Sequence, residues 1–150
     1  MSDKVKLGFI ACGGIIRSHL DQGLGRFPDV EFVGWCDLDP AVAEARKAQV
    51  GGQGAVYTDA KQMLDEAKPD AVYIALPPYG HGVPEALVVE RRLPFFIEKP
   101  VAIDTATAER IAEGVEKHGL ITSVGYMTRY RRSVRRVREL VGPEMPIAVT

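Results

Sequence analysis

The chain has 150 residues, of which 46% are hydrophobic and 26% are charged, and its formal net charge is −1. This length and composition are typical of one globular α/β domain with a hydrophobic core. The small net charge excludes a global electrostatic attraction to nucleic acid or to an anionic membrane surface. The longest apolar run, residues 7–16, contains three glycines and is too short to span a bilayer.

The two cysteines indicate a reducing compartment. Cys12 and Cys36 fall in or beside predicted buried strand ends, where reduced structural thiols of cytosolic proteins are common. Cys12 lies in a glycine turn, so a reactive thiol is an alternative to a packing role. The opening Met-Ser-Asp-Lys lacks the pattern of a signal peptide, and we expect a cytoplasmic protein.

The amino-terminal stretch predicts a strand, a turn and a helix in immediate succession. We expect a buried strand over 5–10, a glycine turn over 11–14, and a helix with Ile16, Leu20, Gly23 and Phe27 on one face. Glycines allow the backbone to approach a ligand closely, and the first turn of a helix offers unpaired N–H groups and a positive dipole end. This stretch therefore predicts a phosphate-binding turn.

The turn matches the dinucleotide fingerprint G-x-G-x-x-G/A only in part. Ala11, Gly13 and Ile16 occupy its three fixed positions, so only the middle glycine is kept, and Gly14 adds a second small residue. A tight strand-to-helix connection without any ligand is the alternative interpretation of this stretch alone.

Asp37 favours the dinucleotide interpretation. It follows the apolar strand 30–36 and lies about 20 residues beyond the turn, where a carboxylate can accept from both hydroxyls of an adenosine ribose. The next helix has its own start signal in Asp39 and Pro40, so Asp37 is not needed to cap it. Because a carboxylate here would repel a 2′-phosphate, we expect NAD as the cofactor rather than NADP.

Strand and helix patterns alternate through the rest of the chain. We expect helices over 40–49, 59–67, 82–92 and 105–118, the last with Ala108, Ile111, Ala112 and Val115 on one face, and strands over 55–57, 71–76, 95–97 and 121–124. Strands without polar alternation, such as 71–76, are typical of a parallel sheet covered by helices on both faces. The fold class is therefore a Rossmann-like, doubly wound α/β sheet with its site at the carboxyl ends of the strands.

Several motifs follow these strands, and together they carry a specific resemblance. They are the turn Cys12-Gly13-Gly14-Ile15, Cys36-Asp37, Ala75-Leu76-Pro77-Pro78 with His81, Glu98-Lys99-Pro100, and Gly125-Tyr126 with Arg129-Tyr130. On these residues the chain resembles the amino-terminal domain of the Gfo/Idh/MocA family of nicotinamide-dependent oxidoreductases. Glu98-Lys99-Pro100 is the most specific of these motifs, and Ala11 stands where the family usually has glycine.

The resemblance implies a role for each motif. Lys99 would be the catalytic lysine, donating from its ammonium to the substrate oxygen while hydride is transferred, and Glu98 would contact the nicotinamide ribose or orient Lys99. The implied cofactor-binding residues are Ala11, Gly13, Gly14, Ile15, Asp37, Leu76, Pro77, Pro78, His81, Glu98, Lys99 and Arg129. We also predict a cis peptide bond between Lys99 and Pro100. No metal ion is expected.

Structural alternatives accompany some of these roles. Taken alone, Glu98-Lys99 is typical of an exposed ion pair that ends a strand. His81 could equally be a helix-start residue with a satisfied backbone contact. We interpret His19 and His118 as structural.

The segment 129–138 contains six arginines and could suggest nucleic acid. Val134, Val137, Leu140 and Val141 recur at helical spacing among them, which favours an amphipathic helix instead. We therefore expect no nucleic-acid partner and no membrane partner.

Family members continue into a second domain, so the resemblance implies that residues 1–125 form the NAD(P)-binding domain. Residues 126–150 would then form a helix and the start of a substrate and oligomerisation domain, with a strand over 146–150. The implied activity is hydride transfer to or from a sugar, cyclitol or related hydroxyl or carbonyl compound, in a homo-oligomer. This chain alone would turn over little. A non-catalytic dinucleotide-binding regulator is the alternative, since the same fold serves both.

Overall fold

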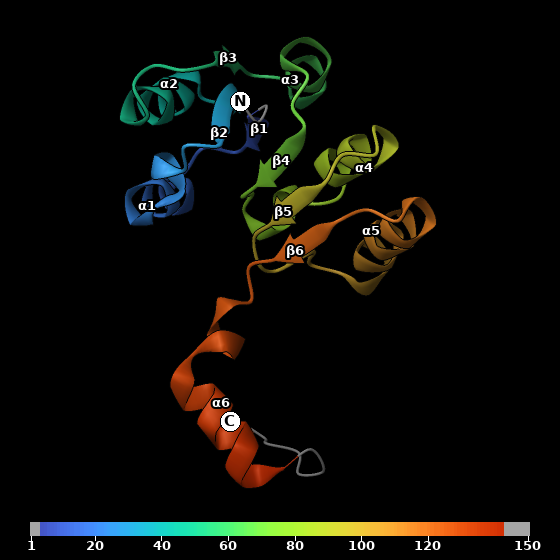
Figure 1. Cartoon of the computed structure of the whole chain (residues 1–150). Coiled ribbons are helices and arrows are strands. Elements are labelled where there is room, and N and C mark those ends of the chain that lie inside the picture. Colours follow the sequence, from blue (N-terminus) through green and yellow to red (C-terminus); the bar gives the residue numbers. More distant parts are fainter. Residues whose placement is uncertain (1–3, 143–150) are drawn as a thin grey trace.

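A computed structural model describes residues 4–142 and consists of one sheet flanked by helices (Figure 1). The strands are β1 (Val5–Ile10), β2 (Val30–Cys36), β3 (Ala55–Tyr57), β4 (Ala71–Ile74), β5 (Phe95–Ile97) and β6 (Thr122–Val124). The α-helices are α1 (Gly14–Gln22), α2 (Pro40–Gln49), α3 (Ala60–Ala67), α4 (Val83–Glu90), α5 (Thr105–His118) and α6 (Arg132–Val141). Short 3₁₀ turns are η1 (Leu24–Arg26), η2 (Pro78–Gly80) and η3 (Met127–Tyr130).

The sheet has the order β3-β2-β1-β4-β5-β6, and every neighbouring pair is parallel. Strands β2 and β3 therefore lie on one side of β1, and the later strands β4, β5 and β6 lie on its other side. This is the order of a doubly wound dinucleotide-binding fold, and the prediction of that fold class is confirmed. Its topological switch point lies between β1 and β4, where ligands bind in such sheets.

A row of aromatic rings crosses one face of the sheet. Trp35 on β2, Phe9 on β1, Tyr73 on β4 and Phe96 on β5 stand in register, with centroid separations of 4.4, 5.6 and 4.3 Å along the row. Helices α1 and α2 cover the half of this row that contains Trp35 and Phe9, which are fully buried. The opposite face carries a second core against α3, α4 and α5.

Two glycines let α3 pack directly on the sheet. Gly8 and Gly34 stand opposite each other on β1 and β2, and a Cβ at Gly34 would lie 2.8 Å from Cγ and Sδ of the buried Met63. The absence of side chains at this pair therefore makes room for the thioether.

Aspartates begin three of the helices. Asp39, Asp59 and Asp104 accept hydrogen bonds from the backbone N–H groups of Ala41, Gln62 and Thr107, at 2.9, 2.7 and 2.8 Å. These bonds satisfy donors that the helix itself leaves unpaired. The predicted start signal at Asp39 is confirmed.

Some predicted boundaries and faces differ from the structure. Helix α1 ends at Gln22, because Gly23 adopts φ 145° and the chain turns into η1; Phe27 consequently lies outside the helix and is 60% exposed. Strand β4 ends at Ile74, two residues early, and on α5 Ala112 is exposed, since the buried residues of that helix are Thr107 and Ile111.

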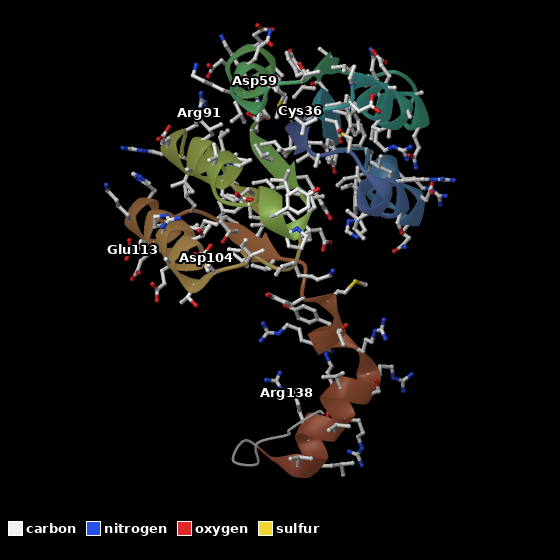
Figure 2. The ribbon with its side chains drawn as sticks, turned by 180° about the vertical axis from the view of Figure 1, so that it is seen from behind. Cys36, Asp59, Arg91, Asp104, Glu113 and Arg138 are labelled. Carbon is white, nitrogen blue, oxygen red and sulfur yellow. The ribbon has the colours of Figure 1, made fainter. Side chains whose placement is uncertain are left out.

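The arginine-rich segment forms the predicted helix, α6, which extends away from the sheet (Figure 1). Its apolar positions include the exposed Val137 and Leu140, and its arginines, Arg138 among them, project outward in Figure 2. The expected strand over 146–150 lies outside the described residues. Across 4–142, no helix has the length and apolar character needed to cross a membrane.

Candidate functional site

The carboxyl ends of the strands meet at one edge of the sheet, as the parallel order requires. Ala11 follows β1, Asp37 follows β2, Leu76 and Pro77 follow β4, and Glu98 follows β5. These five predicted site residues therefore lie after four different strands, at the edge where the sheet reverses its order.

The glycine turn after β1 leaves open space in front of α1. A Cβ at Gly13 or Gly14 would meet no atom within 4 Å, and the first turn of α1 carries no acidic side chain. Because the first N–H groups of a helix have no intrahelical partner, this end of α1 presents donors and a positive dipole end to that space. Ile15, next in the turn, is 41% exposed.

Asp37 ties the turn to the end of β2. Its Oδ2 accepts from the backbone N–H of Cys12 at 2.8 Å, and its Oδ1 accepts from the backbone N–H of Asp39 at 3.0 Å. A carboxylate oxygen has two acceptor sites, so each retains capacity for a ligand hydroxyl. Asp39 separately caps α2, which confirms that Asp37 is not needed for that purpose.

A cavity of about 420 Å³, here called the edge cavity, opens beside this turn. It lies between the ends of β1 and β2 and the segment after β4, and it is lined by Ile10, Ala11, Cys36, Asp37, Leu38, Thr58, Ala60, Leu76, Pro77, Tyr79, Gly80 and Pro84. Its walls are mostly apolar with the carboxylate of Asp37 at one side. Such a combination suits a flat ring carrying a hydroxylated sugar.

The cysteine thiols beside this cavity are inert by burial. The pKa of Cys36 is raised to about 11, first by burial and then by the charges of Asp59 and Asp37. Figure 2 labels Cys36, at the end of β2, and Asp59, just before α3, near each other. Cys12 is fully buried, and burial followed by the charge of Asp37 raises its pKa well above the ordinary range. Packing is therefore the role that fits both thiols.

His81 does not line the edge cavity. Its side chain is 0% exposed, and Nδ1 lies 2.7 Å from Oε1 of the equally buried Glu85, whose Oε2 accepts from the backbone N–H of Gly82 at 2.6 Å. The imidazole thus helps to fix the start of α4. This is close to the alternative interpretation of His81 as a helix-start residue, except that the partner of the ring is a carboxylate and not a backbone group. Pro78 begins η2 beside the cavity and is exposed.

Glu98 and Lys99 do not form an exposed ion pair. Glu98 is 6% exposed, and its Oε2 accepts from the backbone N–H of Lys99 at 3.1 Å. The Lys99 side chain is exposed at the sheet edge, and within 4–142 no hydrogen bond or ion pair involves its ammonium. The peptide bond between Lys99 and Pro100 is cis, as predicted.

Arg129 lies in η3, beyond the last strand, and is exposed. Its guanidinium carbon lies 5.9 Å from the ring centroid of Tyr130, so it stacks on its neighbour instead of reaching the edge cavity. The structure therefore does not bring Arg129 together with Asp37 and Ala11.

Two side chains beside Glu98 had no predicted role in the site. His19 Nε2 lies 3.6 Å from Glu98 Oε1, and His19 Nδ1 is hydrogen-bonded to the hydroxyl of Tyr73. A signal for His19 was present, because it follows the buried Ile16 by three residues and so shares its helix face. Nothing in the sequence indicated that Tyr73 would reach it.

Comparison with known proteins identifies the family. A model described as "Oxidoreductase family, NAD-binding Rossmann fold" for Gfo/Idh/MocA proteins matches residues 5–126. The chain belongs to this family.

Inositol dehydrogenases are among its relatives in the Gfo/Idh/MocA family. The chain is 29% identical over 136 residues to an inositol 2-dehydrogenase/D-chiro-inositol 3-dehydrogenase of Lacticaseibacillus casei, covering 90% of this chain and 39% of that protein. It is 25% identical over 140 residues to an inositol 2-dehydrogenase of Ralstonia nicotianae, covering 91% and 41%. The chain thus spans about two fifths of the length of these relatives.

Solved structures of inositol dehydrogenases have the same fold as this chain. A myo-inositol dehydrogenase from Lactobacillus casei in complex with NAD(H) and myo-inositol superposes with a TM-score of 0.81 at 28% identity, covering 91% of this chain and 41% of that one. A myo-inositol 2-dehydrogenase from Lactobacillus plantarum gives a TM-score of 0.81 at 26% identity, with 93% and 41% coverage.

Proposed function

We propose that this chain is the NAD-binding domain of a dehydrogenase that transfers hydride to or from a cyclitol or a related sugar-like alcohol. The observation that carries the proposal is the arrangement at the sheet edge, where the open glycine turn tied to Asp37 lies at the same edge as the exposed ammonium of Lys99. The names of the relatives, which are inositol dehydrogenases, support the substrate class.

The residues of the edge fit a dinucleotide. The N–H groups at the start of α1 would hold the pyrophosphate, for which Gly13 and Gly14 leave room. Asp37 would accept from the ribose hydroxyls, and the apolar walls formed by Leu38, Leu76 and Pro77 would enclose the adenine. Because the carboxylate of Asp37 would repel a 2′-phosphate, we propose NAD as the cofactor and not NADP.

Lys99 is the residue of this chain that takes part in the chemical step. When bound, NAD(H) accepts or delivers the hydride. When hydride is added to the substrate carbon, the ammonium of Lys99 donates its proton to the oxygen on that carbon. When hydride is removed, the neutral amine of Lys99 accepts the proton from that oxygen. Glu98 holds the backbone N–H of Lys99 and so keeps the lysine at the edge.

The same proposal covers the organisation of the protein. Residues 1–125 form the cofactor domain, and residues 126–150 lead into a domain that supplies further substrate contacts and assembles a homo-oligomer. The relatives are longer than this chain, which supports such a second part. Two buried, free thiols, Cys12 and Cys36, support a cytoplasmic location.

The proposal is tested by substituting the lysine in the protein that contains this chain. We expect Lys99→Ala to reduce turnover of myo-inositol with NAD by about 10²- to 10⁴-fold, the range for losing a general acid or base, while calorimetric NAD binding stays within about threefold. Lys117→Ala, at an exposed lysine of α5, is the matched control and should keep full turnover. Unchanged turnover in Lys99→Ala would remove the catalytic role of the lysine. Binding of NAD without any turnover by the unsubstituted protein would instead leave a dinucleotide-binding regulator, which has no need of the lysine.

A further inference from the structure

A polar network joins three elements beside the proposed catalytic residue, Lys99. His19 comes from α1, Tyr73 from β4, and Glu98 from the end of β5. The Tyr73 hydroxyl is hydrogen-bonded to His19 Nδ1, and His19 Nε2 lies 3.6 Å from Glu98 Oε1. The other oxygen of Glu98 accepts from the backbone N–H of Lys99 at 3.1 Å. A continuous polar chain therefore leads from the cofactor helix to the backbone of Lys99.

The direction of the hydrogen bonds follows from Tyr73. Burial, followed by the charge of Glu98, raises the pKa of Tyr73 well above its ordinary range, so the hydroxyl keeps its proton. Within residues 4–142, His19 Nδ1 is the one hydrogen-bond partner of this hydroxyl, and we take the hydroxyl as the donor to it. Nδ1 of His19 is then the acceptor. A neutral imidazole that accepts at Nδ1 carries its hydrogen on Nε2, which faces the Glu98 carboxylate.

The surroundings leave Glu98 little freedom. A Cβ at Gly125 would lie 2.8 Å from Oε2 and 2.9 Å from Oε1 of Glu98, so the backbone after β6 closes directly over the carboxylate. Within residues 4–142, no lysine or arginine side-chain nitrogen lies within 4.0 Å of it. Because a buried carboxylate is costly without a partner, the Lys99 backbone N–H and the nearby imidazole of His19 are the groups that can offset its burial.

The imidazole itself is fixed by aromatic packing. Its ring stands edge-on to Tyr73 and Phe96, with centroid separations of 5.7 and 6.4 Å. These two rings continue the aromatic row of the sheet, whose other end lies under α1 and α2. The imidazole that faces Glu98 therefore packs against the end of this aromatic row, where Tyr73 and Phe96 are half-buried.

We propose that His19 is a positioning residue, whose Nε2 faces the Glu98 carboxylate at 3.6 Å and whose electrostatic attraction to it helps to fix the Glu98–Lys99 segment at the sheet edge. The inference rests on the proposed function, because Lys99 is the residue whose position matters. His19 lies on α1, the helix whose first turn is proposed to hold the pyrophosphate, so the same rigid helix sets the cofactor and the lysine relative to each other.

The hydrogen-bond direction is tested first, without any substitution. Nitrogen-15 NMR of the 150-residue chain labelled at histidine distinguishes the two neutral tautomers by their ring correlations. We expect His19 to carry its hydrogen on Nε2, and Tyr73→Phe to shift the Nδ1 resonance by removing its donor. A wild-type His19 that carries its hydrogen on Nδ1 overturns the network, whether or not any variant folds.

The positioning role is tested by the amide resonance of Lys99 in the same chain. We expect His19→Ala to shift this resonance, and His19→Gln to restore it, because the glutamine amide nitrogen can replace Nε2–H as a donor to Glu98. His118→Ala, at the end of α5, is the matched control and should leave the resonance in place. An unshifted Lys99 amide in a folded His19→Ala chain contradicts the proposal, and so does a failure of His19→Gln to restore it.

These outcomes are independent of the test of the proposed function. The tautomer and the Lys99 amide report geometry, whereas the turnover of Lys99→Ala reports the chemical role of the lysine. Retained turnover in Lys99→Ala would therefore refute the catalytic assignment while the network itself could still be present.

Discussion

At the scale of single residues, the turn after β1 contains a local strain. Ala11 adopts φ 63°, in the left-handed region that glycine occupies at little cost. A non-glycine residue there costs about 1–2 kcal/mol, of which the greater freedom of glycine in the unfolded chain offsets about 0.5–1 kcal/mol. The backbone of the turn is thus compatible with glycine, and alanine is tolerated.

We expect Ala11→Gly to raise the free energy of unfolding by about 0.5–1 kcal/mol, because it relieves this conformation. Urea denaturation of the two chains measures the difference. Gly23→Ala, at φ 145°, is the opposite substitution and should lower stability. A lower stability for Ala11→Gly would mean that the methyl group contributes packing that outweighs the strain.

Residue roles were predictable from sequence where a local pattern fixed them. The roles of Asp37 and Asp39 could be distinguished in the sequence, because Pro40 marks a helix start after Asp39. In the structure the two carboxylates accept from different backbone N–H groups. The burial of His81 was not predictable, because it depends on the packing of Glu85 inside the domain. The contact between His19 and Glu98 likewise joins residues far apart in sequence.

At the scale of elements, α5 depends on its amino-terminal cap. The backbone N–H of Thr107, followed by its hydroxyl, lowers the pKa of Asp104 below its ordinary value of 3.8. The carboxylate therefore stabilises the folded chain above about pH 3.8, and this contribution is lost as the pH falls through the lower, folded-state pKa.

We expect Asp104→Ala to lower the thermal midpoint at neutral pH, and the gap to wild type to narrow under acid conditions where Asp104 is protonated. Asp104→Asn is the control, because asparagine is also a good cap but does not titrate. Thermal melts followed by circular dichroism, at neutral pH and at a pH where Asp104 is protonated, measure the thermal midpoints of the three chains. A gap between wild type and Asp104→Ala that is the same at both pH values would contradict this account of the cap.

The packing of α3 on the sheet depends on Gly34. An added Cβ would meet Met63 at 2.8 Å in a fully buried position, and overpacking of this kind costs about 1–3 kcal/mol. We expect Gly34→Ala to reduce the free energy of unfolding by that amount in a denaturant titration. Gly14→Ala, where the added Cβ meets nothing within 4 Å, is the matched control. Equal midpoints for the two variants would show that Met63 moves aside freely.

The order of the elements was predictable because apolar strands alternate with capped helices along the chain. Strands 5–10, 30–36, 55–57 and 95–97 agree with the structure residue for residue. The errors arose where tertiary geometry ends an element. A positive φ at Gly23 stops α1 before Phe27, and β4 ends at Ile74, two residues short of the predicted strand.

At the scale of the whole molecule, the parallel sheet explains why distant motifs gather. Ala11, Asp37, Leu76 and Glu98 follow four strand ends at one edge of the sheet. This follows from the predicted parallel sheet alone. The direction of α6 could not be predicted, because an amphipathic pattern does not say which surface the apolar side of a helix faces. In the structure that helix extends away from the sheet.

The central claim is that this chain binds NAD through the turn after β1 and Asp37. Calorimetric titration of the 150-residue chain with NADH and, separately, with NADPH at fixed salt and pH tests it most directly. We predict that NADH binds more tightly than NADPH, and that Gly13→Val abolishes binding by filling the space in front of α1. Binding of neither nucleotide, or unchanged NADH binding in a folded Gly13→Val chain, would contradict the claim.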